Sequence, residues 1–343
     1  MKKLNILTQT AKNKLINKRS GESKFGQHIQ LISDAFNIYE QLKDLDVQYV
    51  IFGIPESIGV IGNNGKPGTE SAWEYALTTL LNTQKNKFND GSKVAVLGHL
   101  DFSEEQAYID TLNHNKLSDL KKVRATVANI DKEVSQLVHD IVKAGKKPII
   151  IGGGHNNAYG NIKGTSLALN TSINAINFDA HTDFRAEEGR HSGNGFSYAF
   201  TEGFLDKYFI YGIHENYTSD NILTKMSKLK KQVQYNTFET IQIRQELKFK
   251  KECKRALEFI SKKPFGIEID CDAIEQIPSS AMTPSGFSVN KTRQFLHYFG
   301  SHNNAAYLHI CEAAPKLGSK KTANQTAKLI SYLITDFIRC HGN

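Results

Sequence analysis

Short apolar runs rich in β-branched residues recur along the chain, and most end at a Gly or an Asp. They cover residues 47–55, 93–99, 147–154, 173–179, 208–213, 264–270 and 305–313. Amphipathic stretches of helical length occur at 119–145, 240–262 and near 321–340. Strands that alternate with helices are typical of a parallel sheet covered on both faces, so the pattern predicts an α/β fold.

The chain reads as one large domain preceded by a basic segment. No linker rich in Pro, Gly or Ser divides it, and no repeat of fixed period is present. We therefore predict a domain over residues 46–343 and, in residues 1–45, a basic N-terminal arm followed by a helix around 28–43. Residues 1–26 hold seven Lys or Arg and one acidic residue, so most of the net charge of +8 lies there. Such an arm is most often solvated and partly disordered, and we expect no nucleic-acid partner.

The composition indicates a globular protein without a membrane segment. Hydrophobic residues make up 39% of the chain, and no apolar run approaches the roughly 20 residues of a membrane helix. The basic arm also lacks the apolar segment of a secretory signal. Four cysteines are spread without CxxC spacing, so we expect reduced thiols and a cytoplasmic location.

Acidic residues and histidines gather where three of the predicted strands end. Asp179, His181 and Asp183 occupy alternate positions just after the run 173–179. Residues two apart face the same side of an extended chain, so these three side chains should project together if the strand stays extended. Ligands in open parallel sheets bind beyond the carboxyl ends of the strands. The motif therefore predicts a site at that edge.

Two further fragments repeat this arrangement. Asp270 and Asp272 end the run 264–270 at the same alternate spacing, and His155 follows the three glycines of "IIIGGGH". Four carboxylates and two imidazoles in one crevice require compensating cations, because burial and like charges would otherwise raise the carboxyl pKa values. An oxygen-rich set without thiolates favours a hard divalent ion such as Mn²⁺. Six ligands suit two metals that activate a water molecule between them.

The segments "GGGH", "DAHTD" and "EIDCD", in this order, resemble the signature segments of the ureohydrolase family, which includes arginase, agmatinase, guanidinobutyrase and formimidoylglutamase. The likeness covers roughly residues 50–340 and extends to "GVIGNNGKPGTESAW" at 59–73 and "HICEAAP" at 309–315. It implies a three-layer αβα fold with a mostly parallel sheet of about eight strands. It also implies a homo-oligomer and two Mn²⁺ per subunit, bound by His155, Asp179, His181, Asp183, Asp270 and Asp272. Glu312 would hold the cationic amidine or guanidine.

The sequence departs from the family pattern at two places. Asp272 is followed by "AIEQIP" instead of a further Asp-Pro. In "HSGNGF", Ser192 and Gly193 take the place of the His-Gly pair found in arginase and agmatinase, with His191 one step earlier. We expect His191 to be a surface loop histidine and not a proton shuttle.

Three features resemble the formimidoylglutamase branch: "GGGHNNAYG", the Arg at position 185 and the Ser-Gly pair. That branch converts N-formimidoyl-L-glutamate to L-glutamate and formamide, and Arg185 suits the carboxylates of such a substrate. We expect Ser192 and Asn194 to contact it as well. Asp183 would orient the attacking water and pass a proton to the departing amine.

Other functions stay open at this point. Arginase, agmatinase or guanidinobutyrase activity would release urea from the same kind of centre. A related deacetylase would need one zinc and fewer acidic ligands, and a non-catalytic metal-binding homologue would keep the fold alone. A substrate panel with Mn²⁺ separates the hydrolases.

Overall fold

The computed structural model describes residues 1–340. Within this range the strands are β1 (Leu4–Ile6), β2 (Tyr49–Gly53), β3 (Val94–Leu100), β4 (Lys147–Ile151), β5 (Ile173–Phe178), β6 (Leu205–Ile213), β7 (Val233–Thr237), β8 (Phe265–Asp270) and β9 (Ala305–Cys311). The helices are α1 (Gln9–Leu15), α2 (Ile38–Asp44), α3 (Ile58–Gly62), α4 (Ala72–Leu81), α5 (Ser103–Asp110), α6 (Leu117–Lys143), α7 (Asn157–Leu169), α8 (Gly195–Thr201), α9 (Asp220–Lys228), α10 (Phe249–Ile260), α11 (Val289–Gly300) and α12 (Lys320–Arg339).

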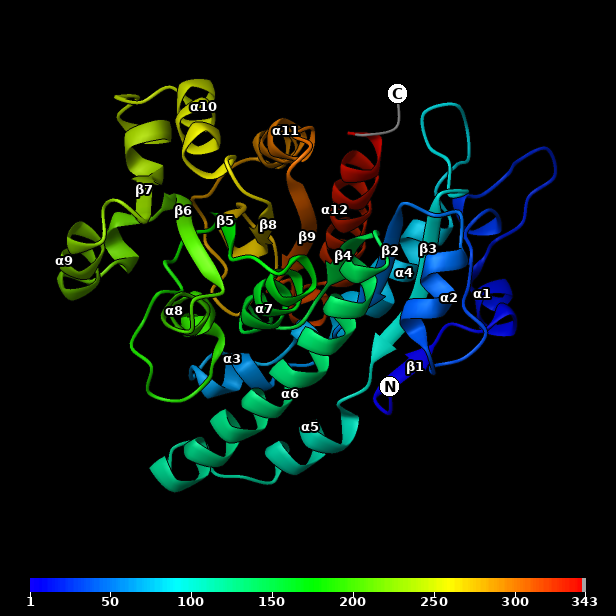
Figure 1. Cartoon of the computed structure of the whole chain (residues 1–343), viewed down its shortest axis with the longest axis horizontal. Helices are drawn as coiled ribbons and strands as arrows, with labels where there is room; N and C mark the ends of the chain where they lie inside the picture. The colour runs from blue at the N-terminus through cyan, green and yellow to red at the C-terminus, as the bar shows by residue number, and fades with distance from the viewer. Residues whose placement is uncertain (341–343) are drawn as a thin grey trace.

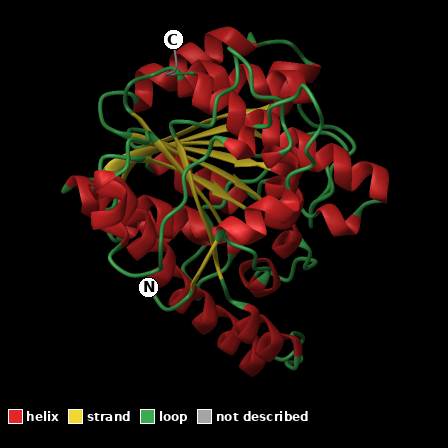
Figure 2. Cartoon of the chain, turned by 90° about the vertical axis from the view of Figure 1, so that its right-hand side faces the viewer, coloured by secondary structure: helices red, strands yellow, loops and turns green. Residues whose placement is uncertain are grey.

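All strands of this range form one sheet in the order β1-β3-β2-β4-β9-β8-β5-β6-β7. Every neighbouring pair is parallel except β1 and β3, which are antiparallel. Figure 2 shows the twisted sheet between helices on its two sides. The mostly parallel α/β architecture predicted from the sequence is therefore confirmed, and each of the predicted strand runs forms a strand.

Two apolar layers hold the helices against the sheet, one on each face. One layer packs α4, α10, α11 and α12, and the other packs α2, α6, α7 and α8 (Figure 1). Strand β4 supplies both, because Ile149 and Ile151 point into the first layer and Ile150 into the second. A strand buried on both faces reads as a continuous apolar run, which is why its sequence predicted a central position.

The long helices are amphipathic. Helix α6 buries Val123, Val127, Ile130 and Val134 at spacings of three or four residues, which places them on one side of the helix. Among residues 1–340, no helix is both long and apolar enough to span a membrane. Helix α10 begins at Phe249, later than the predicted 240, because residues Glu239–Ile243 form a short π-helical turn.

The N-terminal segment differs from the solvated arm that its charge suggests. Strand β1 pairs with β3 in the register Leu4 with Leu100, so it forms one edge of the sheet. Leu4 and Leu7 are buried. The helix expected around 28–43 is shorter, at Ile38–Asp44. Together with β7, this strand brings the sheet to nine strands within residues 1–340.

Candidate metal centre

The predicted site residues lie at one edge of the sheet, beyond four neighbouring strands. Strands β4, β9, β8 and β5 are adjacent and parallel, so their carboxyl ends meet. His155 follows β4, Asp179 follows β5, Asp270 ends β8 and Glu312 follows β9. Each of the four central strands thus brings one acidic residue or histidine to the crevice at its carboxyl end.

The side chains of all the predicted ligands come together there, in two groups that share Asp179. Within each group, one potential ligand atom per residue lies within 4.8 Å of the others. The first group is His155, Asp179, Asp183 and Asp270, and the second is Asp179, His181 and Asp272. In the first group, His155 Nδ1 lies 3.3 Å from Asp179 Oδ2, 2.9 Å from Asp183 Oδ2 and 3.1 Å from Asp270 Oδ2.

The two acidic motifs reach this geometry by turning and not, as their spacing suggested, by staying extended. Asp179 Oδ1 accepts a hydrogen bond from the backbone N–H of His181 at 2.6 Å. Asp270 Oδ1 accepts one from the N–H of Asp272 at 2.8 Å, and residues Cys271–Ala273 form a 3₁₀ turn. In both motifs a carboxylate bonds the amide two residues on, a local turn for which Asp is well suited. The expectation of extended strand ends was therefore wrong, although the side chains converge.

The glycine turn before His155 is held by a buried carboxylate. Gly152 and Gly153 have φ values of +87° and +70°, a conformation that favours glycine. Glu56, which has no exposed surface, accepts hydrogen bonds from the N–H of Gly154 at 3.1 Å and from Asn157 Nδ2 at 2.8 Å. Sequence reasoning missed Glu56, although a charged residue directly after the predicted strand 47–55 was a signal.

The electrostatics of the centre favour bound cations. Burial and the charges of Asp272 and Asp179 raise the pKa of Asp270 well above its usual range. Burial also raises the pKa of Asp183 to about 6. Asp272 Oδ1 is buried without a hydrogen-bond partner among the described residues. A set of carboxylate oxygens and imidazole nitrogens with an unsatisfied oxygen fits hard divalent ions such as Mn²⁺.

A cavity of about 560 Å³ opens above these groups. Glu312 contributes to its lining and accepts a hydrogen bond from the His155 N–H at 2.8 Å. Burial raises the pKa of Glu312 to about 8. Arg185 and Ser192 also line the cavity, and Arg185 Nη1 donates to Asn63 Oδ1 at 2.7 Å. Asn63 is a lining residue that sequence reasoning did not single out.

Asn194 does not line this cavity, contrary to expectation. It has no exposed surface, and its Oδ1 accepts hydrogen bonds from Arg190 Nη1 at 2.6 Å and from the His191 N–H at 3.1 Å. Its Nδ2 donates to the carbonyl oxygens of Ala186 and Gly189. The side chain therefore stabilises the loop and is not free to bind a ligand.

His191 is buried and not on the surface, which corrects the sequence expectation. Its Nδ1 accepts a hydrogen bond from the Gly193 N–H at 3.1 Å. Burial, together with Arg124 and Arg185, lowers the pKa of His191 to about 3. The ring is thus neutral at physiological pH and lies outside the cavity lining.

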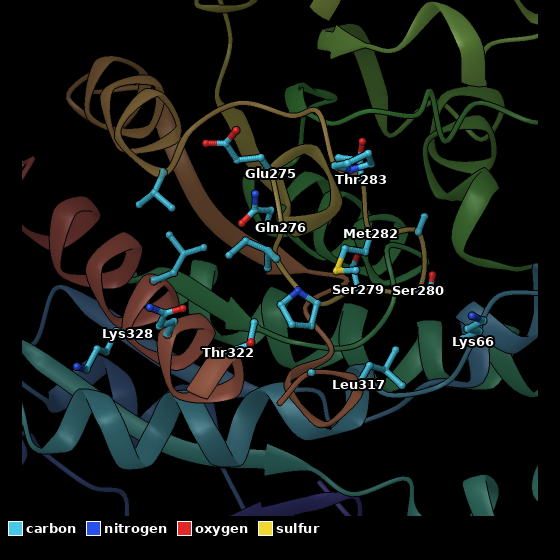
Figure 3. Close-up of a pocket in the computed structure, with 18 of the residues that line it drawn as sticks. Lys66, Glu275, Gln276, Ser279, Ser280, Met282, Thr283, Leu317, Thr322 and Lys328 are labelled. Atoms are coloured by element: carbon cyan, nitrogen blue, oxygen red, sulfur yellow. The ribbon is translucent and has the colours of Figure 1, made fainter. Parts of the chain in front are cut away.

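A second, larger cavity of about 1250 Å³ adjoins the first. Its wall contains the segment 275–284, and Figure 3 shows Lys66 and Lys328 at opposite sides of the view. His181 and Tyr217 line both cavities, and their rings stack with centroids 5.2 Å apart. Tyr217 therefore stands at the boundary between the two spaces. It was not singled out from the sequence.

Comparison with known proteins agrees with this geometry. Residues 47–337 match the arginase family. A formimidoylglutamase from Streptococcus pyogenes serotype M3 is 30% identical over 228 residues, which cover 61% of this chain and 69% of the relative.

Solved structures share the fold. Formimidoylglutamase from Bacillus subtilis aligns with a TM-score of 0.72 and 19% identity over 93% of each chain. A Trypanosoma cruzi formiminoglutamase N114H variant with Mn²⁺ aligns with a TM-score of 0.71 and 17% identity over 94% of this chain and 99% of that one. A hypothetical agmatinase from Burkholderia thailandensis aligns with a TM-score of 0.66 and 15% identity over 87% of this chain and 88% of that one. With its matching family segment, parallel sheet and clustered ligand groups, the chain belongs to the arginase family and is a metal-dependent hydrolase of linear amidines.

Proposed function

We propose that this hydrolase is a formimidoylglutamase that converts N-formimidoyl-L-glutamate to L-glutamate and formamide. One observation carries the proposal: the clustered ligand groups and Glu312 share a cavity with Arg185. The amidine end of a substrate can reach the ligand groups and Glu312 while its carboxylate reaches Arg185. The formimidoylglutamase identity of the S. pyogenes relative supports the same substrate.

The metal ligands in this proposal are the residues of the two groups. His155, Asp179, Asp183 and Asp270 surround one Mn²⁺ position, and Asp179, His181 and Asp272 surround the other. When bound, a pair of divalent ions supplies Lewis-acid activation of water and lowers its pKa toward neutrality.

Protein side chains carry the remaining steps. The Glu312 carboxylate pairs with the cationic amidine and fixes its approach, because a cation next to a buried carboxylate offsets the cost of its burial. The Asp183 carboxylate would take up the proton that the attacking water loses as its oxygen bonds the amidine carbon, and would deliver it to the nitrogen of glutamate as the C–N bond breaks. Its side chain is mostly covered, but 12% of its surface is exposed and it lines the cavity.

Arg185 binds a carboxylate of the substrate. Its side chain is 52% exposed, Nη1 donates to Asn63 Oδ1, and Nη2 lies 3.7 Å from Glu188 Oε1, an exposed ion pair that a substrate carboxylate would displace. The other donors of the planar guanidinium can form a paired hydrogen bond to a carboxylate. Ser192, which also lines the cavity, adds a hydroxyl near the same rim.

A substrate panel tests the proposal. The Mn²⁺-loaded protein is assayed with N-formimidoyl-L-glutamate, L-arginine, agmatine and 4-guanidinobutyrate, and formamide and urea are measured separately. We expect formamide and glutamate from the first compound at the highest kcat/KM. A higher kcat/KM with release of urea from any guanidine would contradict the assignment.

The variant Arg185→Ala tests the carboxylate contact. Loss of a charge-assisted hydrogen bond, worth about 1.5–3 kcal/mol, should raise KM for N-formimidoyl-L-glutamate roughly 10- to 100-fold. Agmatine has no carboxylate, so any residual agmatine hydrolysis should keep its KM. Equal effects on both substrates would argue against carboxylate recognition by Arg185.

A further inference from the structure

A buried polar cluster lies behind His155, on the side away from the proposed metal ligands. Glu268 on β8 and Tyr307 and His309 on β9 have no exposed surface. Glu268 and His309 are direct partners in the register of the two strands. The proposed reaction uses none of these side chains, and a glutamate is almost never fully buried unless it is paired.

Hydrogen bonds hold the Glu268 carboxylate in one orientation. Tyr307 donates its hydroxyl to Oε1 at 2.7 Å, and His309 Nδ1 lies 2.5 Å from Oε2. On its other side, His309 Nε2 lies 3.3 Å from the carbonyl oxygen of Gly152. The cluster therefore connects Glu268 with the glycine turn that precedes His155.

The two nitrogens of His155 face opposite environments. Nδ1 faces the carboxylates of the first ligand group, whereas Nε2 faces Glu268 Oε2 at 3.5 Å and has no hydrogen-bond partner among residues 1–340. A neutral imidazole that binds a metal through Nδ1 carries its proton on Nε2. A carboxylate placed beside Nε2 favours that tautomer and fixes the ring plane.

We infer that Glu268, braced by Tyr307 and His309, is the positioning residue that orients His155 for one of the two metal ions. The inference rests on the metal centre of the proposed function. With Cys311, the residues His155, Glu268 and His309 form a third group of potential ligand atoms within 4.8 Å of one another. Both carboxylate oxygens of Glu268 are already engaged by Tyr307 and His309, which favours a supporting role over a third ion. Glu268 acts through His155 and does not touch the substrate cavity.

The variant Glu268→Gln tests this role by Mn²⁺ binding, without any need for turnover. Metal-free protein is titrated with Mn²⁺, and bound and free ions are followed by EPR and calorimetry. The glutamine side chain has only one oxygen, so its NH₂ must face the Tyr307 hydroxyl on one side or His309 Nδ1 and His155 Nε2 on the other. We expect one ion to bind about 10- to 100-fold more weakly, the range found for such supporting partners, while the other keeps its affinity.

The matched control is Glu252→Gln on α10. Glu252 is also a buried glutamate, 5% exposed; it is hydrogen-bonded by Asn236 and Arg255 and lines neither cavity. The Glu252→Gln variant should bind both Mn²⁺ ions with wild-type affinity. Far-UV circular dichroism of the metal-free variants establishes that both are folded.

The variant Tyr307→Phe keeps the inference testable if Glu268→Gln does not fold. Removing one hydroxyl should weaken the same ion by a smaller factor. In the double variant with Glu268→Gln, the Tyr307→Phe effect should largely disappear, because the hydroxyl acts through the carboxylate.

The outcomes separate this inference from the proposed function. If both Glu268→Gln and Tyr307→Phe bind the two Mn²⁺ ions with wild-type affinity, the positioning role is overturned and the proposed function still stands. Equal weakening of both ions, also in Glu252→Gln, would mean general destabilisation and would overturn it too. A third tightly bound ion in the wild type would make the cluster a metal site instead. A wild-type protein that binds no Mn²⁺ would remove the metal centre itself.

Discussion

Asp183 and Glu312 have backbone conformations that are uncommon for their residue types. Their φ values are +44° and +58°. Residues in this left-handed region cost of order 1–3 kcal/mol and persist where the surroundings hold them. The Glu312 N–H donates to the carbonyl oxygen of Gly153 at 3.1 Å, so the strained residue is tied to the turn before His155. Both proposed catalytic side chains therefore stand on strained backbone, and they account for two of the seven non-glycine residues with positive φ in the described range.

At the same scale, His191 makes stability depend on pH. Its pKa in the folded chain is about 3, below the ordinary value of 6.5, because of burial and the neighbouring Arg124, Arg185 and Arg190. A lowered histidine pKa contributes stability that is present above pH 6.5 and lost as the pH falls. Below pH 6.5 the loss reaches up to about 1.4 kcal/mol per pH unit.

The variant His191→Asn should weaken this dependence, because the amide oxygen can still accept the Gly193 N–H but does not titrate. We expect the denaturation midpoint to fall less between pH 7 and pH 5 in the variant than in the wild type. Urea unfolding at both pH values measures it. Parallel losses in the two proteins would show that other groups control the acid response.

At the scale of elements, a buried ion pair joins α6 to the loop beside the site. Arg190 bonds Asp131 through Nε at 2.8 Å and Nη2 at 3.2 Å, and its guanidinium lies between the rings of Tyr159 and Tyr198. Nη2 also donates to the carbonyl oxygen of Asn156, the residue after His155. Burial raises the pKa of Asp131 to about 6, so this pair holds the loop at an electrostatic cost.

The variant Arg190→Met should therefore destabilise the protein by about 3–5 kcal/mol, since it leaves a buried carboxylate unpaired. The matched control is Arg244→Met, which breaks the exposed pair of Arg244 with Glu215 and should cost under about 1 kcal/mol. Chemical denaturation of both variants at pH 7.5 gives the comparison. Similar small losses in both would contradict the role of the Asp131 pair.

The edge strand β1 is a second element whose contribution can be measured. Gly98 of β3 has a φ of +122°, and a Cβ there would lie 2.0 Å from the carbonyl oxygen of Asn5, so the two strands approach closely. Deleting residues 1–7 removes two buried leucines. The truncated protein should lose about 3–6 kcal/mol, at roughly 1.5–3 kcal/mol per buried leucine.

Substitution of the exposed Lys2 by Gln controls for the loss of charge in this segment and should leave stability unchanged. Unfolding of the three proteins in urea provides the measurement. An unchanged urea midpoint after truncation would show that residues 1–7 do not stabilise the fold, as expected of the solvated arm that the charge pattern suggested.

At the scale of the whole molecule, the two apolar layers and the acidic centre have opposing effects on stability. The layers bury both faces of the sheet, whereas the ligand groups concentrate carboxylates at its carboxyl edge. Ions that bind only the folded chain stabilise it by mass action. At 100 times the Kd, each independent site adds about 2.7 kcal/mol.

We therefore expect Mn²⁺ to raise the thermal midpoint and EDTA to lower it. Differential scanning calorimetry with MnCl₂, and with KCl at equal ionic strength as the control, tests this. An identical midpoint in both salts would count against binding of Mn²⁺ to the native fold.

The ligand groups could be predicted from the sequence because each ligand stands in a short, recognisable segment. Asp179, Asp270 and His155 each follow an apolar run, and parallel strands must end at a common edge. Strand β7 was missed because it is a short edge strand with mixed burial, which leaves no clear alternation. Glu268 and His309 were visible as charged or titratable residues inside apolar runs, and that signal was overlooked.

The sequence by itself determined the α/β class, the strands that carry the chemistry and the residues that form the two ligand groups, because these follow from apolar periodicity and from the residue types at strand ends. Tertiary structure alone decided that β4, β9, β8 and β5 are neighbours and that Asn194 and His191 face the interior. These features depend on contacts between segments that are distant in the sequence, as between His155 and Asp270. No local pattern encodes such contacts, because their free energy appears only once the chain is packed.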